Sequence, residues 1–275
     1  MTNIVFFGCS FTYGEDSAAP SRKTMSDIFP GYPWGTTATD WYDPELTYPA
    51  FVGKAFNGQH NIVNKGWPGY SNHAIYLSVV DYVFEDPDRD FSDFIFVVNF
   101  TQIYRSITAT SPDKSDPCNF VRYQKYDEPL PFKCVMPGNK VYQDWCLNNP
   151  DEEYSYVSLG RAFEKTHILE VETSTIIRAI KEFLQSRNIK FMFVNMLMNT
   201  DINYKFKTVA LKDILNDDHF IINGKTLWTD YVNEIKIPLV IWAKYGGIFT
   251  GHPNSVGYKF IADIVSYELK NRFKL

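Results

Sequence analysis

The length, composition and charge are those of an ordinary globular protein: 275 residues, 45% hydrophobic and 21% charged, with a formal net charge of −5. The basic residues are scattered, which argues against nucleic acid or an anionic membrane surface as a partner. No segment approaches the roughly 18 apolar residues that span a bilayer, and no export signal is visible at the N-terminus. We therefore expect a protein of the cytoplasm that binds a neutral or mildly polar small molecule.

The strands predicted from the sequence are short runs rich in Ile, Val and Phe, at residues 3–8, 61–64, 93–99, 189–195 and 219–222. Between them, apolar residues recur at helical spacing over 48–57, 71–85 and 161–187, and a last helix follows the cap residue Asn254. This alternation is typical of an α/β fold. We expect a three-layer, flavodoxin-like and mostly parallel sheet of five strands, in the order 2-1-3-4-5, with helices on both faces.

Two stretches, about 28–47 and 106–158, are dense in Pro, Gly, Asp and aromatic residues, and their apolar residues show neither helical nor strand periodicity. They predict long loops inserted into the α/β frame, and loops of that length usually carry function or cover a site. Neither a repeat nor a domain linker is visible. The whole chain, 1–275, is therefore predicted to be a single domain.

The four cysteines and four of the five histidines give no reason to expect a metal or another cofactor. The cysteines form no CxxC pair, and these four histidines have no HxxH or HxxxH spacing. Reduced thiols and structural histidines are the expected reading for this group, which comprises Cys9, Cys118, Cys134, Cys146, His60, His73, His167 and His219.

The first strand ends in a glycine-bracketed loop, Gly8-Cys9-Ser10-Phe11-Thr12-Tyr13-Gly14. Such a loop suits a thiol nucleophile, a phosphate cradle or a serine nucleophile. A cysteine phosphatase would need an arginine six residues after Cys9, where this chain has Glu15. A phosphate cradle usually includes Lys or Arg, and acids stand there instead, which leaves a flavodoxin-like nucleotide site as the lesser alternative.

A serine nucleophile requires a histidine, donors for an oxyanion and usually a carboxylate that holds the histidine. Residues in three later segments could supply the first two: Gly69 in a loop after the second strand, Asn99 at the end of the third, and His252 before the last helix. Strands one and three should be neighbours in a sheet of this order, and Gly69 lies in the loop that leaves strand two. Ser10, Gly69 and Asn99 should therefore face one crevice.

Four blocks of the sequence resemble those of the SGNH hydrolase superfamily, the GDSL esterases and lipases, and they occur in the family's order. The blocks are GCSFTYG at 8–14, VNKGWPG at 63–69, VVNF at 97–100 and GHPNSVGY at 251–258. The chain is also similar to SGNH-like proteins encoded by tailed phages. Three departures are Cys9 for the usual Asp, the loss of Gly and Asp around Asn99, and Phe249 where the family has its triad acid.

The resemblance implies a serine esterase without a cofactor, acting on a small acyl ester of a carbohydrate or lipid. Ser10 would be the nucleophile and His252 the base of a Ser-His dyad. The backbone amides of Ser10 and Gly69 and the side-chain amide of Asn99 would form the oxyanion hole. Aromatic residues near the blocks are candidates for substrate binding: Trp34, Trp41, Tyr42 and Trp67.

Phe249 favours a second interpretation, in which the protein is not an efficient enzyme. A phenyl ring cannot accept the imidazole proton of His252, so the histidine must be oriented by a backbone carbonyl or by another carboxylate, of which Asp217, Asp218 and Asp263 are candidates. Otherwise the chain is a catalytically weak or inactive SGNH-fold binding or structural protein, which could be a phage component.

Overall fold

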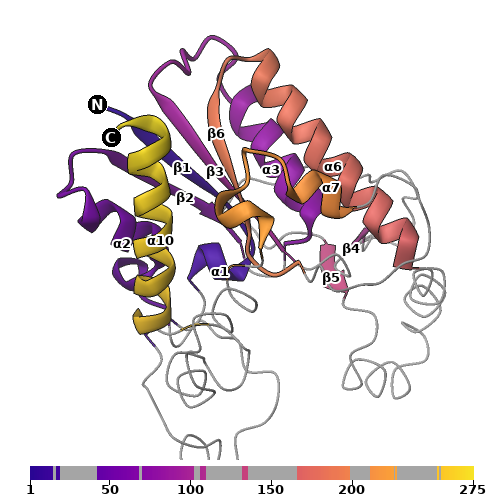
Figure 1. The fold of residues 1–275 in the computed structure, drawn as a ribbon, viewed down its shortest axis with the longest axis horizontal. Coiled ribbons are helices and arrows are strands. Elements are labelled where there is room, and N and C mark those ends of the chain that lie inside the picture. The colour runs from indigo at the N-terminus through magenta and orange to yellow at the C-terminus, as the bar shows by residue number, and fades with distance from the viewer. Residues whose placement is uncertain are drawn as a thin grey trace, which may run out of the picture.

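The computed structural model describes residues 1–14, 17–18, 42–67, 70–101, 106–109, 132–135, 166–198, 211–225, 227, 253 and 255–275. Within them, a parallel sheet is covered by helices on both faces, which is the predicted α/β fold (Figure 1). None of the described helices is long and apolar enough to cross a membrane.

The main sheet contains four parallel strands in the order β2-β1-β3-β6. They are β1 (Asn3–Gly8), β2 (Asn61–Gly66), β3 (Phe94–Phe100) and β6 (Lys190–Asn195). This order confirms the predicted 2-1-3-4 arrangement. The central strands β1 and β3 are buried along almost their whole length, because an internal parallel strand has helices over both of its faces.

Helices form one layer on each side of the sheet. On one side, α2 (Tyr48–Ala55) packs against β2 and against the last helix, α10 (Ser255–Phe273); on the other, α3 (Asn72–Phe84) packs against β1 and β3, and α6 (Thr166–Ser186) against β6 (Figure 1). The side chains of β1 alternate between the layers, so Phe6 contacts Tyr48 of α2 while Phe7 contacts Tyr82 of α3.

The prediction of a fifth strand at 219–222 is wrong. Phe220 makes one isolated parallel bridge to Phe193 of β6, and a 3₁₀ turn, η3 (Ile221–Gly224), follows at once. Ile222 and Asn223 have φ angles of 47° and 55°. This left-handed backbone cannot continue a strand, so residues 219–222 contribute one bridge to β6 and not a fifth strand.

Short elements complete the described residues. A four-residue helix, α1 (Ser10–Tyr13), follows β1, a 3₁₀ turn, η2 (Pro44–Leu46), precedes α2, and α7 (Leu211–Leu215) packs on α6. Inside 106–158, which the sequence predicts as a loop, β4 (Ser106–Ala109) and β5 (Phe132–Val135) form a separate antiparallel pair.

Candidate functional site

Ser10 is the first residue of α1 and comes two residues after the end of β1, at the carboxyl edge of the parallel sheet. Its residue surface is only 2% exposed. Cys9 precedes it as the helix cap residue, is a buried free thiol, and makes no side-chain capping bond. The edge of the sheet where Ser10 lies is the edge at which ligands of open α/β sheets bind.

Gly8 and Gly66 allow α1 to lie tightly against the ends of two strands. A Cβ atom at Gly8 would come 2.0 Å from Thr12 Oγ1, and one at Gly66 would come 2.5 Å from the backbone nitrogen of Tyr13. Neither distance is possible for a real side chain. The two glycines are therefore required by the close approach of α1, which determines the position of Ser10.

Asn99 is the predicted oxyanion residue that the structure describes in most detail. It lies on β3, is 1% exposed, and donates through Nδ2 to the carbonyl oxygen of Phe7 at 2.7 Å. The same nitrogen is 3.3 Å from the carbonyl oxygen of Val97. Asn99 is thus fixed against the end of β1, just before the chain turns into Ser10. A bound oxyanion would compete with the Val97 carbonyl for the second amide hydrogen of Asn99.

Asn64, in the second half of β2, contacts the candidate nucleophile helix and was not singled out from the sequence. Its Nδ2 donates to the carbonyl oxygens of Thr12 at 2.8 Å and of Tyr13 at 3.3 Å, and its Oδ1 accepts from the amide of Gly66 at 3.0 Å. These bonds satisfy the last carbonyls of α1. Asn64 therefore ties α1, and with it Ser10, to the neighbouring strand.

Asn72 connects the start of α3 with the residue that follows β3. Its Nδ2 donates to the Thr101 carbonyl at 3.1 Å, and its Oδ1 accepts from the Thr101 amide at 2.8 Å. Ser71 caps α3 through a 3.2 Å bond from the amide of Ala74. The capping role agrees with the predicted start of this helix, and the bond to Thr101 holds the exit from β3 close to Asn99.

Of the aromatic residues predicted to bind substrate, Trp67 and Tyr42 are described, and both contact Tyr13 of α1. The Tyr42 ring stacks on that of Tyr13 with centroids 4.4 Å apart, and the Trp67 ring meets it edge-on at 5.8 Å. The backbone nitrogen of Trp67 also donates to the Gly8 carbonyl at 3.0 Å. These contacts pack the loops around α1.

The other predicted site residues lie outside the described part of the chain: His252, Gly69, Trp34 and Trp41. Phe249, at the position where the family has its acid, also lies outside it. The assignment of base and second oxyanion donor therefore stays a prediction.

Asp217, a candidate for orienting His252, already has partners elsewhere. One carboxylate oxygen accepts a hydrogen bond from Lys181 of α6, and the other is 2.6 Å from Nδ1 of His219. Burial raises the pKa of Asp217, but the bonds from Lys181 and His219 and the Lys181 charge outweigh it and lower the pKa to about 2. Asp263 pairs instead with Lys259 one turn away on α10, so neither carboxylate is uncommitted.

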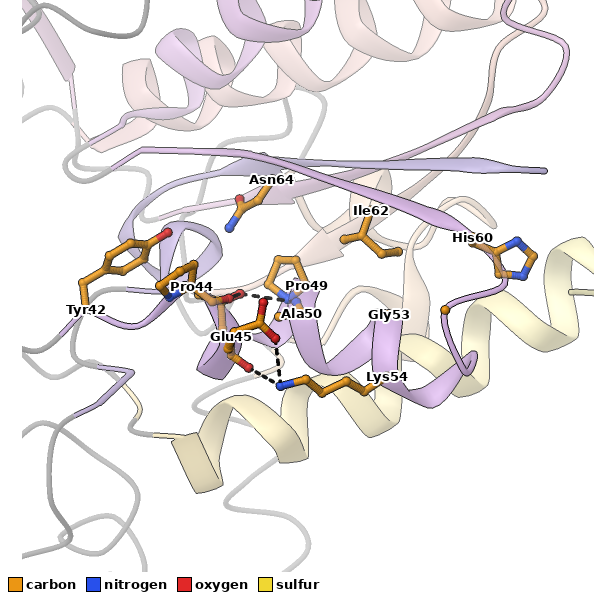
Figure 2. A pocket seen from close by; sticks show the side chains of 12 residues that line it. Tyr42, Pro44, Glu45, Pro49, Ala50, Gly53, Lys54, His60, Ile62 and Asn64 are labelled. Atoms are coloured by element: carbon orange, nitrogen blue, oxygen red, sulfur yellow. Dashed lines mark hydrogen bonds and ion pairs between the residues drawn. The ribbon is translucent and has the colours of Figure 1, made fainter.

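Two cavities of about 420 Å³ each are lined by described residues, and neither is lined by Ser10 or Asn99. The first lies between α2 and the edge strand β2, with Tyr42 and Asn64 at one end and His60 at the other, and the ion pair of Lys54 with Glu45 beside it (Figure 2). The second lies between α6, α7 and β6 and includes Asp217. Among the residues that the structure describes, no group of three His, Cys, Asp or Glu side chains could hold a metal ion.

Comparison with known proteins gave similarity at the level of solved structures only. No protein-family model and no curated protein matches the chain. It is similar to a protein from Desulfitobacterium hafniense described as lipolytic and of the G-D-S-L family, with 14% identity, 97% and 99% of the two chains covered and a TM-score of 0.40.

Two further similar structures are an acetyl xylan esterase, with 14% identity, 97% and 99% of the chains covered and a TM-score of 0.43, and a carbohydrate acetylesterase family member from Sinorhizobium meliloti. The latter has 10% identity, full coverage of both chains and a TM-score of 0.44. These identities and TM-scores are too low to assign a family, an activity or a residue role to this chain.

Proposed function

We propose that the protein is a serine ester hydrolase that transfers a small acyl group from an ester to water. Ser10 Oγ attacks the acyl carbon while His252 takes its proton. The ester C–O bond then breaks, the alcohol leaves with that proton, and water hydrolyses the acyl-serine. The Asn99 amide and the backbone amides of Ser10 and Gly69 stabilise the oxyanion, and each such donor is typically worth about 3 kcal/mol.

The hydrogen bond from Asn99 Nδ2 to the Phe7 carbonyl is the single observation that carries the proposal. It brings a predicted oxyanion donor on β3 to the end of β1, from which the chain turns directly into Ser10. The two residues are 89 positions apart in the sequence. The resemblance to the family's motifs requires Ser10 and Asn99 to share one site. The hydrogen bond from Asn99 to Phe7 supports their proximity independently of the motifs.

Hydrolysis of p-nitrophenyl acetate tests the proposal. We expect Ser10→Ala to abolish turnover and His252→Ala to reduce kcat by at least about 10³-fold. For wild type, kcat/KM should rise with pH as a single general base loses its proton. Cys9→Ala is the matched control, because it removes the neighbouring thiol and should retain turnover.

A second candidate function, a binding or structural protein without catalysis, is favoured by Phe249, since it removes the acid expected to orient His252. The same assay separates the two. Turnover by wild type that does not exceed turnover by Ser10→Ala would favour the second candidate.

A further inference from the structure

Three of the seven buried side-chain polar atoms that have no hydrogen-bond partner among the described residues belong to residues near the end of β1. Within the described part of the chain they are Thr12 Oγ1 on α1, Tyr48 Oη on α2 and Asn99 Oδ1 on β3. Thr12 and Tyr48 are fully buried and Asn99 is 1% exposed. A buried polar atom without a partner typically costs about 1–3 kcal/mol, so three of them in one place call for a physical explanation.

Two of the three side chains, those of Thr12 and Asn99, meet at Gly8, and Tyr48 packs on the same face of β1. A Cβ atom at Gly8 would come 2.0 Å from Thr12 Oγ1 and 3.0 Å from Asn99 Cβ. Tyr48 packs edge-on against Phe6 with ring centroids 5.4 Å apart. Phe6 and Gly8 face the same side of β1 because side chains alternate along a strand. The Tyr48 ring thus lies on the face of the sheet toward which Gly8 opens.

The three groups have complementary capacities to donate and accept hydrogen bonds. Asn99 Oδ1 can only accept, the Tyr48 phenol has one proton to donate, and the Thr12 hydroxyl can donate and accept. Burial raises the pKa of the Tyr48 phenol, and the Thr12 side chain only partly opposes that rise. The phenol therefore keeps its proton throughout the range in which the protein would work.

The orientation of the Asn99 amide is determined on its other side. Its nitrogen faces the Phe7 carbonyl at 2.7 Å, and an inverted amide would bring two acceptor oxygens to that distance. The oxygen end must therefore face the cluster. Hydrogen bonds from Thr12 to Tyr48 and from Tyr48 to Asn99 would give each of the three atoms a partner.

We propose that Tyr48 is a positioning residue for Asn99: its hydroxyl donates to Asn99 Oδ1, accepts from the Thr12 hydroxyl, and so holds the amide nitrogen at the Phe7 carbonyl, just before the turn into Ser10. The inference rests on the proposed function, in which that nitrogen is an oxyanion donor. A hydrogen bond to Oδ1 also polarises the amide and strengthens Nδ2 as a donor. Tyr48 acts through Asn99 and does not touch substrate.

Tyr48→Phe tests the inference, because it keeps the ring that packs on Phe6 and removes only the hydroxyl. With p-nitrophenyl acetate we expect kcat to fall about tenfold while KM is nearly unchanged, since the donor is misplaced rather than lost. Tyr82→Phe is the matched control. It removes another largely buried phenol, which lies on the opposite face of β1, and should leave kcat unchanged.

A second readout does not depend on activity. In ¹⁵N-labelled protein, we expect the Asn99 side-chain amide to exchange with solvent about tenfold faster in Tyr48→Phe than in wild type, because one of its anchors is lost. Tyr82→Phe should match wild type. Should Tyr48→Phe not fold, Thr12→Val removes the other hydroxyl of the cluster and should shift kcat and exchange in the same directions.

The two proposals fail separately. If wild type does not hydrolyse the ester, the proposed function fails, and the exchange of the Asn99 amide still decides the role of Tyr48. If wild type is active but folded Tyr48→Phe has the same kcat and the same Asn99 exchange, the positioning role is overturned.

Discussion

The side-chain amide of Asn99 donates to the carbonyl oxygen of Phe7 at 2.7 Å, linking the end of β3 to the end of β1 immediately before the turn into Ser10. The bond is buried and joins residues far apart in the sequence. It makes the geometry of the candidate nucleophile loop depend on a neighbouring strand. Substitutions at Asn99 should consequently affect both stability and chemistry.

Asn99→Asp should lower the free energy of unfolding by about 2 kcal/mol near neutral pH, because it places a carboxylate against the Phe7 carbonyl. Burial and this neighbouring acceptor should raise the pKa of the introduced carboxyl above its unfolded value. The protonated acid can donate to Phe7, so the loss relative to wild type should shrink as pH falls. Urea titrations at several pH values measure it.

Asn61→Asp is the control for that experiment, because the Asn61 side chain makes a 2.9 Å bond to Asn3 at an exposed position. It should cost less than about 0.5 kcal/mol at every pH. An equal effect of the two substitutions would show that the Asn99 bond has no special importance.

Gly8→Ala should destabilise the protein by about 2 kcal/mol and slow ester turnover, because the new Cβ would lie 2.0 Å from Thr12 Oγ1 and 2.8 Å from Thr12 Cβ. The clash must displace α1 and with it Ser10. Thermal unfolding and kcat measure the two effects.

Gly58→Ala separates this clash from backbone strain. Gly58 has a φ of +70° and nothing within 4 Å of a Cβ atom, so the substitution should cost about 1 kcal/mol with no loss of turnover. If Gly8→Ala behaves in the same way, the tight contact of α1 does not determine the position of Ser10.

Asn64→Ala should reduce kcat more than KM, because Asn64 holds the last turn of α1 through the carbonyls of Thr12 and Tyr13. We expect a fall of about tenfold from a misplaced nucleophile. Asn61→Asp, on the same strand but at its far end, should retain the wild-type kcat. Steady-state kinetics with equal amounts of folded enzyme provide the comparison.

The lowered pKa of Asp217 should make the stability of the folded protein depend on pH in the acid range. Its pKa of about 2 lies below the ordinary value of 3.8, so its ion pair with Lys181 stabilises the folded protein above pH 3.8 and that stabilisation is lost as pH falls toward 2. Asp217→Asn should lower stability by about 1 kcal/mol near neutral pH and flatten this part of the profile.

The comparison for Asp217 is Asp263→Asn, which breaks an exposed pair with Lys259 and should cost less than about 0.5 kcal/mol. Thermal melts between neutral pH and the acid limit test both variants. A profile for Asp217→Asn that runs parallel to the wild-type profile would contradict the role assigned to this carboxylate.

The sequence predicts β1, β3 and β6 well because they are nearly continuous apolar runs, which is typical of parallel strands buried on both faces. The fifth strand fails for a local reason: HFII reads as a strand, but the left-handed backbone at Ile222 and Asn223 turns the chain away. Propensity cannot reveal a conformation that these residues rarely adopt.

Motif spacing predicts Ser10 and Asn99 as site residues, which stays a prediction, whereas it does not point to Asn64 or Tyr48, whose contacts come from the structure. A signal for Asn64 was available. Three of the predicted strands have an asparagine at or near the end of their apolar run, as NIVN, FVVN and MFVN. In each case the asparagine side chain donates to a backbone carbonyl. Tyr48 gave no such signal, because its hydroxyl meets Asn99 only after α2 packs on the sheet.

Covalent labelling by a fluorophosphonate, with the adduct located by mass spectrometry, tests the central claim most directly. The account predicts one adduct on Ser10, lost in Ser10→Ala, strongly slowed in His252→Ala and retained in Cys9→Ala. Absence of an adduct on Ser10, under conditions in which an ordinary serine esterase is fully labelled, would contradict it.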